Sequence, residues 1–368
     1  MSDALVKAIS FITFIFIGLL LKNKFSSKDE INGLKKIILL LALPATIFVA
    51  LIKVKLHIDL LFLPFIALAF NLVLFFATPL LLQILGFTNK PIINTAKLLI
   101  PSLAPGLSCF PFILEFLGEP YLAKAAMADL GNKFFVLFIL YLVAIKWFYR
   151  NKNQKKESIY TKLKSLFKVM LFEPVNLFII LALILLFSGI TLTDLPLFIQ
   201  ENLIRLSDIM TPLILLFIGL AVAIKRKQFT QIFSLLMLRY GLSLLLIGFV
   251  ISVFDFEMGN DVLFMIAFAL SACSFWPFAH ISSIAIREKD LPEKEQTFNT
   301  KFALSVLALS LPLSVLLILM VFTAGNTFIN PTNVYLLALF IILLGIALPF
   351  FKWAKNGAQI KNRYSKTD

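Results

Sequence analysis

The sequence contains little cysteine, histidine or charge, and each shortage narrows the classes of protein it could encode. Two cysteines and two histidines occur in 368 residues, a pattern that indicates neither a disulfide framework nor a metal site. The histidines, His57 and His280, lie in different halves, and we find no serine–histidine pair, glycine-rich phosphate loop or di-aspartate motif. We therefore expect no enzyme, no cofactor and no resident metal.

Charged residues make up 15% of the chain, against about 25% in a typical soluble protein. Hydrophobic residues make up 60% and the mean hydropathy is +0.96, which together predict an all-α polytopic membrane protein in contact with lipid. The net charge of +14 does not point to nucleic acid, because the excess lysine lies between apolar runs. The first apolar run, 11–21, ends at Lys22 without a small-residue cleavage site, so we expect no cleaved signal peptide.

Eleven apolar segments approach the length of about 20 residues that a spanning helix needs. They cover approximately 4–21, 31–52, 60–86, 93–118, 121–148, 169–190, 203–224, 229–254, 262–286, 296–323 and 329–352. Basic residues gather in alternate connections and in the tail, within 22–36, 90–97, 146–168, 225–227, 287–294 and 352–366. Since cytoplasmic connections carry an excess of Lys and Arg, we expect a cell-membrane protein with its N-terminus outside and its C-terminus in the cytoplasm.

Two interrupted stretches organise the chain, one in each half: 107–112, Leu-Ser-Cys-Phe-Pro-Phe, and 271–278, Ser-Ala-Cys-Ser-Phe-Trp-Pro-Phe. Each places a Cys and small neighbours just before an aromatic-Pro-Phe step. Proline kinks or breaks a helix, and in lipid a break survives only where protein or a water-filled cavity covers the freed backbone groups. Paired breaks at corresponding places in two halves predict the binding site of a transporter.

Other markers recur in the same order in both halves. Segments two and seven carry Leu-Pro-Ala at 43–45 and Thr-Pro-Leu at 211–213, while segments five and ten carry Asn-Lys-Phe at 132–134 and Asn-Thr-Lys-Phe at 299–302. Because five spans per repeat is an odd number, the second copy enters the membrane from the opposite side, as an inverted repeat. We expect a first repeat over 1–148, a basic cytoplasmic linker over 149–168, a second repeat over 169–323, and an extra span with a basic tail over 324–368.

These residues resemble those of the auxin efflux carrier family, also called AEC or PIN-type permeases. The most specific part is Gly-Glu-Pro-Tyr-Leu at 118–122 followed by Asp-Leu-Gly-Asn at 129–132, which is similar to the family's stretch after its first broken helix. Weaker agreement extends the resemblance over most of 4–323, through Leu-Pro-Ala at 43–45, Gly106, Pro111, Pro212, Gly219 and Arg239.

The resemblance implies ten helices in two inverted five-helix repeats, with the broken helices four and nine crossing at their prolines. Helices 1, 2, 6 and 7 would form a scaffold through which the protein could pair as a homodimer, and helices 3–5 and 8–10 would form a transport domain. Substrates of the family are organic anions, including auxin and dicarboxylates such as malate and malonate. The sequence departs from the family at Ala104, where Asn is common, at Cys109 in place of a Gly, and at the bulky Trp276.

Three basic residues, Lys133, Arg239 and Lys301, lie well inside predicted spans. A charge at the bilayer centre costs at least about 2.5–3.5 kcal/mol, so each is a functional candidate. Lys133 could hold a substrate carboxylate or pair with Asp129 four residues earlier on the same helix face. Lys301 has no acidic neighbour at helical spacing, so its partner could be a substrate carboxylate, or it could reach the cytoplasmic surface. Arg239 could meet a ligand or tie helices together.

The predicted substrate site gathers around the two breaks, where the positive N-terminal ends of half-helices and serine hydroxyls would favour an anion. The serines could instead hydrogen-bond between helices, the cysteines could be packing residues, and the asparagines could tie helices together. His280 could carry a coupled proton or be structural. A fixed ammonium at Lys133 or Lys301 could replace a coupling cation and make transport independent of Na⁺. The predicted substrate-binding residues are Ser108, Cys109, Pro111, Asn132, Lys133, Ser271, Cys273, Ser274, Pro277, His280, Asn299 and Lys301.

The sequence therefore predicts a secondary transporter of small organic anions that works by alternating access at the crossing of two broken helices. One alternative is a carrier of another solute that is similar to the bile-acid and sodium symporters. A membrane-embedded enzyme, or a channel-like or signalling protein, is a further alternative.

Overall fold

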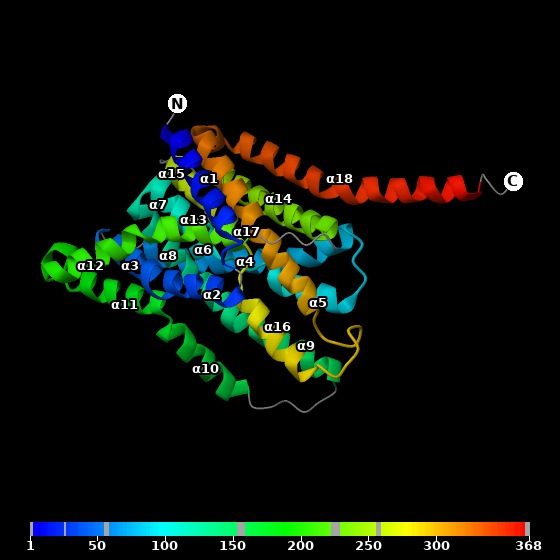
Figure 1. The fold of residues 1–368 in the computed structure, drawn as a ribbon, viewed down its shortest axis with the longest axis horizontal. Coiled ribbons are helices and arrows are strands. Elements are labelled where there is room, and N and C mark those ends of the chain that lie inside the picture. The colour runs from blue at the N-terminus through cyan, green and yellow to red at the C-terminus, as the bar shows by residue number, and fades with distance from the viewer. Residues whose placement is uncertain are drawn as a thin grey trace.

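The computed structural model describes residues 3–25, 27–54, 59–152, 159–221, 229–254 and 259–364. All secondary structure within these ranges is helical, and the chain is an all-α polytopic membrane protein (Figure 1). Seven helical runs are long and apolar enough to span a membrane: Asp3–Leu21, Asp29–Ile52, Leu60–Ile84, Glu119–Asn151, Leu197–Ala221, Phe229–Val253 and Thr300–Ile329. The pair Lys162–Phe172 and Pro174–Phe187, bent by 62°, would be an eighth, and Gly259–Ala269 and Pro331–Ala347 are shorter apolar helices. The count of eleven spans and the inverted repeat stay predictions.

Within the described ranges the chain forms eighteen α-helices, nine of them in its first half. They are α1 (Asp3–Leu21), α2 (Lys28–Ile37), α3 (Leu43–Ile52), α4 (Asp59–Ile84), α5 (Lys90–Leu99), α6 (Pro105–Ser108), α7 (Phe110–Leu117), α8 (Glu119–Phe134) and α9 (Leu140–Lys152). Short π-helical segments, η1 (Ile38–Ala42) and η2 (Phe135–Ile139), continue α2 into α3 and α8 into α9. Each of these pairs therefore acts as one long span.

The second half forms nine more α-helices. They are α10 (Ile159–Phe172), α11 (Pro174–Phe187), α12 (Leu197–Asp208), α13 (Met210–Ala221), α14 (Phe229–Val253), α15 (Gly259–Ala269), α16 (Trp276–Arg287), α17 (Thr300–Ala324) and α18 (Pro331–Tyr364). Of the linker predicted over 149–168, residues 149–152 end α9, residues 159–168 begin α10, and 153–158 lie outside the described ranges. The C-terminal part of α18 projects well beyond the other helices (Figure 1).

Prolines begin helices in this fold more often than they interrupt them. Pro105, Pro111 and Pro277 each lie in the first turn of their helix, where the missing N–H would have no intrahelical partner anyway. The helix is interrupted within the predicted stretch 107–112, at Cys109, but this interruption is short. The longer non-helical stretch is 100–104, between α5 and Pro105, and only Cys109 separates α6 from α7. The second break, 270–275, lies where the sequence predicts it.

The helices pack in two groups. We define the scaffold helices as α1, α2, α3, α11, α12 and α13, which pack mainly through the pairs α1–α13, α3–α11 and α3–α12. We define the crossover helices as α4 to α9 and α14 to α17, where α4 packs on α8 and α14 packs on α4, α15 and α17. The main contact between the two groups is α3 against α8. The extra helix α18 lies along α14.

Glycines allow the closest of these contacts, as small residues do between helices in lipid. A Cβ on Gly18 of α1 would lie 2.3 Å from Leu216 O of α13, and a Cβ on Gly131 of α8 would lie 1.8 Å from Pro64 O of α4. On α14, a Cβ on Gly241 would lie 2.4 Å from the Ile342 side chain of α18. The backbones therefore meet at distances that only glycine permits.

Candidate functional site

The two breaks touch each other inside the crossover helices. Ala104 N donates a 2.8 Å hydrogen bond to Ala272 O, and Ala272 N donates back to Ser108 Oγ at 3.0 Å. Ser274 N donates to Ser102 Oγ, also at 3.0 Å. These three bonds satisfy backbone groups that no helix can satisfy and hold the breaks together. We call residues 100–104 and 270–275, with the side chains that bond to them, the crossing.

Asn132 of α8 holds the first break at its middle. Its Nδ2 donates to Leu103 O at 2.9 Å, and its Oδ1 accepts from Leu103 N at 3.1 Å. The amide also bonds to Asp129 Oδ1 at 2.8 Å and to Asn71 Nδ2 at 3.1 Å. The side chain thus replaces both backbone partners that Leu103 would have in a helix, so this predicted site residue supports the break directly.

Arg239 of α14 holds the start of the same break. Its side chain is fully buried, and its Nε and Nη2 donate to Ile100 O at 2.8 Å and to Ser102 O at 3.1 Å. Nη1 is buried and has no hydrogen-bond partner among the described residues. The guanidinium therefore brings an unneutralised positive charge to the crossing.

The second break is held mainly by α17. Ser314 Oγ donates to Leu270 O at 2.6 Å, Cys273 N donates to Ser310 Oγ at 3.3 Å, and Tyr240 OH donates to Ser310 O at 3.0 Å. Sequence reasoning missed the roles of these side chains and of Ser102. The sequence does contain a signal for Ser310 and Ser314, because these two serines flank Pro312 within an otherwise apolar helix.

The remaining predicted residues of the breaks are buried but differ in their bonding. Both thiols, of Cys109 and Cys273, are buried and free. Ser274 Oγ accepts a 3.3 Å bond from Trp276 N at the start of α16. Ser271 Oγ is buried and has no hydrogen-bond partner within the described ranges. The Ser271 hydroxyl lies beside the Cys109 thiol, and among these side chains it is the hydroxyl that bonds to no nitrogen or oxygen atom.

Lys133 is buried and already has partners from two groups of helices. Its Nζ lies 3.7 Å from Asp129 Oδ2 on its own helix and 3.2 Å from Glu173 Oε2 at the start of α11. It also donates to Asn176 Oδ1 of α11 at 3.0 Å. This ion-pair network joins a crossover helix to a scaffold helix. It agrees with the alternative that Lys133 pairs with Asp129 and does not hold a substrate carboxylate.

Lys301 lies at the first turn of its helix and not well inside a span. The segment predicted to begin at 296 is helical only from Thr300, so Lys301 is the second residue of α17. Its side chain is 80% exposed and pairs with the Glu293 carboxylate. The expectation of a buried lysine is therefore wrong, and the surface alternative holds. Asn299 caps α17 by accepting from Phe302 N at 2.8 Å.

His280 lies on α16, which follows the second break in the chain, and its side chain contacts η2. Its Nε2 is 2.9 Å from Val136 O, and its ring meets that of Tyr141 edge-on at a centroid distance of 5.4 Å. The imidazole thus connects α16 to the η2–α9 span. This agrees with the alternative that His280 is structural and does not carry a coupled proton.

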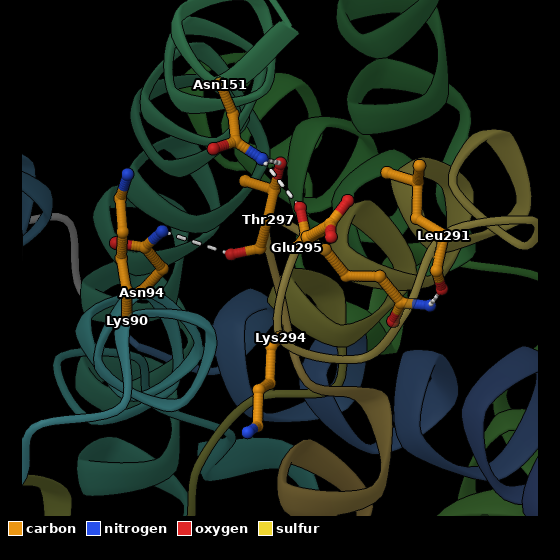
Figure 2. Close-up of a pocket in the computed structure, with 8 residues that line it drawn as sticks. Lys90, Asn94, Asn151, Leu291, Lys294, Glu295 and Thr297 are labelled. Carbon is orange, nitrogen blue, oxygen red and sulfur yellow. Dashed lines mark hydrogen bonds between the residues drawn. The ribbon is translucent and has the colours of Figure 1, made fainter.

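One cavity lies among the crossover helices, and another lies between scaffold and crossover helices. A cavity of about 360 Å³ at the end predicted to be cytoplasmic is lined by Lys90, Asn94, Asn151, Leu291, Lys294, Glu295, Gln296 and Thr297. Figure 2 shows Asn94 and Asn151 reaching the 291–297 segment from two helices, with bonds to Thr297 O at 3.1 Å and Glu295 O at 3.0 Å.

The second cavity, about 510 Å³, opens between α1, α7 and α13 at the end predicted to face outward. Its charged lining is mostly acidic, with Glu115, Glu119 and Asp208 against Lys7. Lys7 Nζ donates to Glu115 O at 2.8 Å, so the lysine is already engaged. The charged lining of the 360 Å³ cavity is by contrast mostly basic, with Lys90 and Lys294 against Glu295, and we call it the basic cavity.

Comparison with known proteins finds a partial likeness to a transporter. No family model matches the chain. Over 124 residues the chain is 32% identical to a protein of Methanocaldococcus jannaschii named Uncharacterized transporter MJ1031. The match covers 34% of this chain, and the chain spans 37% of that protein's length. Together with the helical membrane fold, this likeness supports a membrane transporter.

Proposed function

We propose that this chain is a secondary transporter of the auxin efflux carrier type, and that it carries small organic anions by alternating access at the crossing. One observation carries the proposal: two helix breaks from different halves of the chain hydrogen-bond to each other inside an apolar bundle, through Ala104 and Ala272. Irregular backbone at membrane depth is tolerated only where it is buried in protein or lines a water-filled cavity, and paired broken helices in the two halves of a chain point to the binding site of a transporter.

Charge at the crossing favours an anion. The Arg239 guanidinium has no carboxylate within ion-pair distance among the described residues, and a buried charge without a partner is unfavourable. Arg239 Nη1 and Ser271 Oγ are both buried without a hydrogen-bond partner in the described part of the chain. A substrate carboxylate would accept from both groups, and the basic cavity, with Lys90 and Lys294 in its lining, would attract an anion at the end predicted to be cytoplasmic.

Ligand-induced stabilisation of the purified protein tests the proposal with a panel of mono- and dicarboxylates. A ligand at 100 times its dissociation constant stabilises the folded state by about 2.7 kcal/mol. With an unfolding entropy of about 2.1 cal/mol/K per residue, this corresponds to a rise of roughly 3 °C in melting temperature. The acid that gives this rise is then tested for uptake into proteoliposomes.

Ser271→Ala is the variant that locates the site. Its hydroxyl has no partner, so its removal is expected to leave the melting temperature without ligand unchanged or raised, while the carboxylate-induced rise is lost. Ser234→Ala is the matched control, because Ser234 is also a fully buried serine with an unpartnered hydroxyl but its backbone faces Gly345 of α18. Absence of a shift with every carboxylate, or an equal shift in wild type and Ser271→Ala, contradicts the proposed site.

A further inference from the structure

The crossing contains a set of oxygen atoms of the kind that binds a cation. Helix α5 ends at Leu99, and the last carbonyls of a helix have no intrahelical donor and carry a partial negative charge. In carriers with broken helices, such carbonyl ends coordinate Na⁺ or a proton. Here Ile100 O and Ser102 O both point at one partner, the guanidinium of Arg239.

Arg239 fills the place of such a cation in several respects. Its side chain is fully buried, and it comes from α14, a different helix from those that carry the breaks. Within the described ranges its hydrogen-bond acceptors are backbone carbonyls and not carboxylates. The positive charge is therefore offset in part by the dipoles of the broken helix, as that of a bound alkali cation would be, and in part by the Tyr240 ring, whose centroid lies 4.9 Å from Arg239 Cζ.

We propose that Arg239 is a tethered cation that occupies the carbonyl site of the first break, so that the crossing folds without a bound metal ion. A second cation at these carbonyls would meet the repulsion of the fixed guanidinium. The sequence suggests such a role for Lys133 or Lys301, but the structure puts Lys133 in a carboxylate network and Lys301 at the surface.

For transport, the inference rests on the proposed function. A carrier whose crossing holds its own cation would bind its substrate without Na⁺. For the fold, the inference stands alone, because the carbonyls of residues 100 and 102 need a donor whether or not an anion is carried. Arg239 acts here as a positioning residue for the break.

Melting of the purified protein in matched concentrations of choline, sodium and guanidinium chloride tests the inference without any substrate. Wild type is expected to melt at the same temperature in sodium and choline. Arg239→Ala, which vacates the site, is expected to melt several degrees lower in choline. For this variant, a few millimolar guanidinium is expected to restore at least half of the lost melting temperature, and the effect should saturate as the guanidinium concentration rises. Sodium is expected to restore part of the lost melting temperature.

Two further variants sharpen the result. Arg205→Ala is the control, because Arg205 is an exposed arginine on α12 that pairs with Glu201, and its melting should not respond to either cation. Arg239→Lys keeps the charge and is expected to melt above Arg239→Ala. If Arg239→Ala does not fold, Arg239→Lys still tests the inference. The lysine would keep a cation at the carbonyls, so the melting temperature of this variant is expected not to change with sodium.

Three results would overturn the inference: saturable stabilisation of wild type by sodium, no cation response in Arg239→Ala, or a lysine variant no more stable than the alanine variant. If no carboxylate in the panel stabilises the protein, the proposal of an organic-anion substrate is contradicted. The melting results in choline, sodium and guanidinium would still test the role of Arg239. The two proposals therefore fail separately.

Discussion

Asn132→Ala should open the first break, and the two native cysteines offer a direct way to measure the opening. Asn132 is the side chain that bonds to both backbone groups of Leu103. Cys109, which lies just beyond that break, is fully buried. A thiol reagent can reach Cys109 only when the region opens, so its labelling rate reports the opening equilibrium.

The size of the effect follows from the bonds that are lost. Each buried polar group left without a partner costs about 1–3 kcal/mol, so the two groups of Leu103 together cost about 2–6 kcal/mol. Each 1.4 kcal/mol is a factor of ten, so the lower end corresponds to a labelling rate about 30-fold faster. We use the lower end, because water entering the space of the lost side chain can satisfy part of the loss.

The assay uses maleimide labelling in detergent in a Cys273→Ala background, so that Cys109 is the remaining thiol of the two in the sequence. Asn202→Ala in the same background is the control, because Asn202 is an exposed asparagine on α12 whose amide bonds to Phe198 O. The control should label at the parental rate. A rate for Asn132→Ala within twofold of the parent would refute the claim that this side chain holds the break.

Two further pairs of variants test the packing and the charges. Gly131→Ala brings a methyl group 1.8 Å from Pro64 O, so we expect a lower melting temperature and a broadened size-exclusion peak. Gly33→Ala, with nothing within 4 Å, should gain helix stability of up to about 1 kcal/mol, and a loss there would contradict the contact argument. Lys133→Ala should lower the free energy of unfolding by about 3–5 kcal/mol, because it leaves two carboxylates without their cation. Lys301→Ala removes an exposed pair and should change it by less than about 1 kcal/mol; equal losses in denaturant titrations would contradict the assigned burial.

Composition and long-range pattern were enough to predict the fold class. Apolar runs between basic connections predict spanning helices. The recurrence of a Cys shortly before a Pro-Phe step predicts one helix break in each half of the chain and a binding site where the two breaks lie. The contact between the breaks could not be derived, because Ala104 and Ala272 contribute backbone atoms, and no side-chain pattern records which backbone groups will pair.

Errors in the site came from element boundaries. Asn299 followed by Thr300 is a helix N-cap signal, since Asn accepts from the first turn, and it would have placed Lys301 at the start of α17. Pro101 lies within the first break and Pro105 directly follows it, so both mark this break more closely than Pro111 does. Arg239 was identified as buried, but its partners are carbonyls 137 and 139 residues away, and the sequence carries no signal for such pairs.

The bonding of the crossing limits how a substrate can bind there. The carbonyls of Ile100, Ser102 and Leu103 already accept from Arg239 and Asn132, and Ser108 Oγ already accepts from Ala272 N. A ligand that displaced these bonds would have to replace every one of them, since a buried group left unpaired costs more than a typical bond returns. A carboxylate that instead accepts from Arg239 Nη1 and Ser271 Oγ satisfies two unpartnered atoms and breaks no bond. Under the proposed function, the bonds that stabilise the breaks would therefore leave Arg239 Nη1 and Ser271 Oγ as the atoms available to an anion.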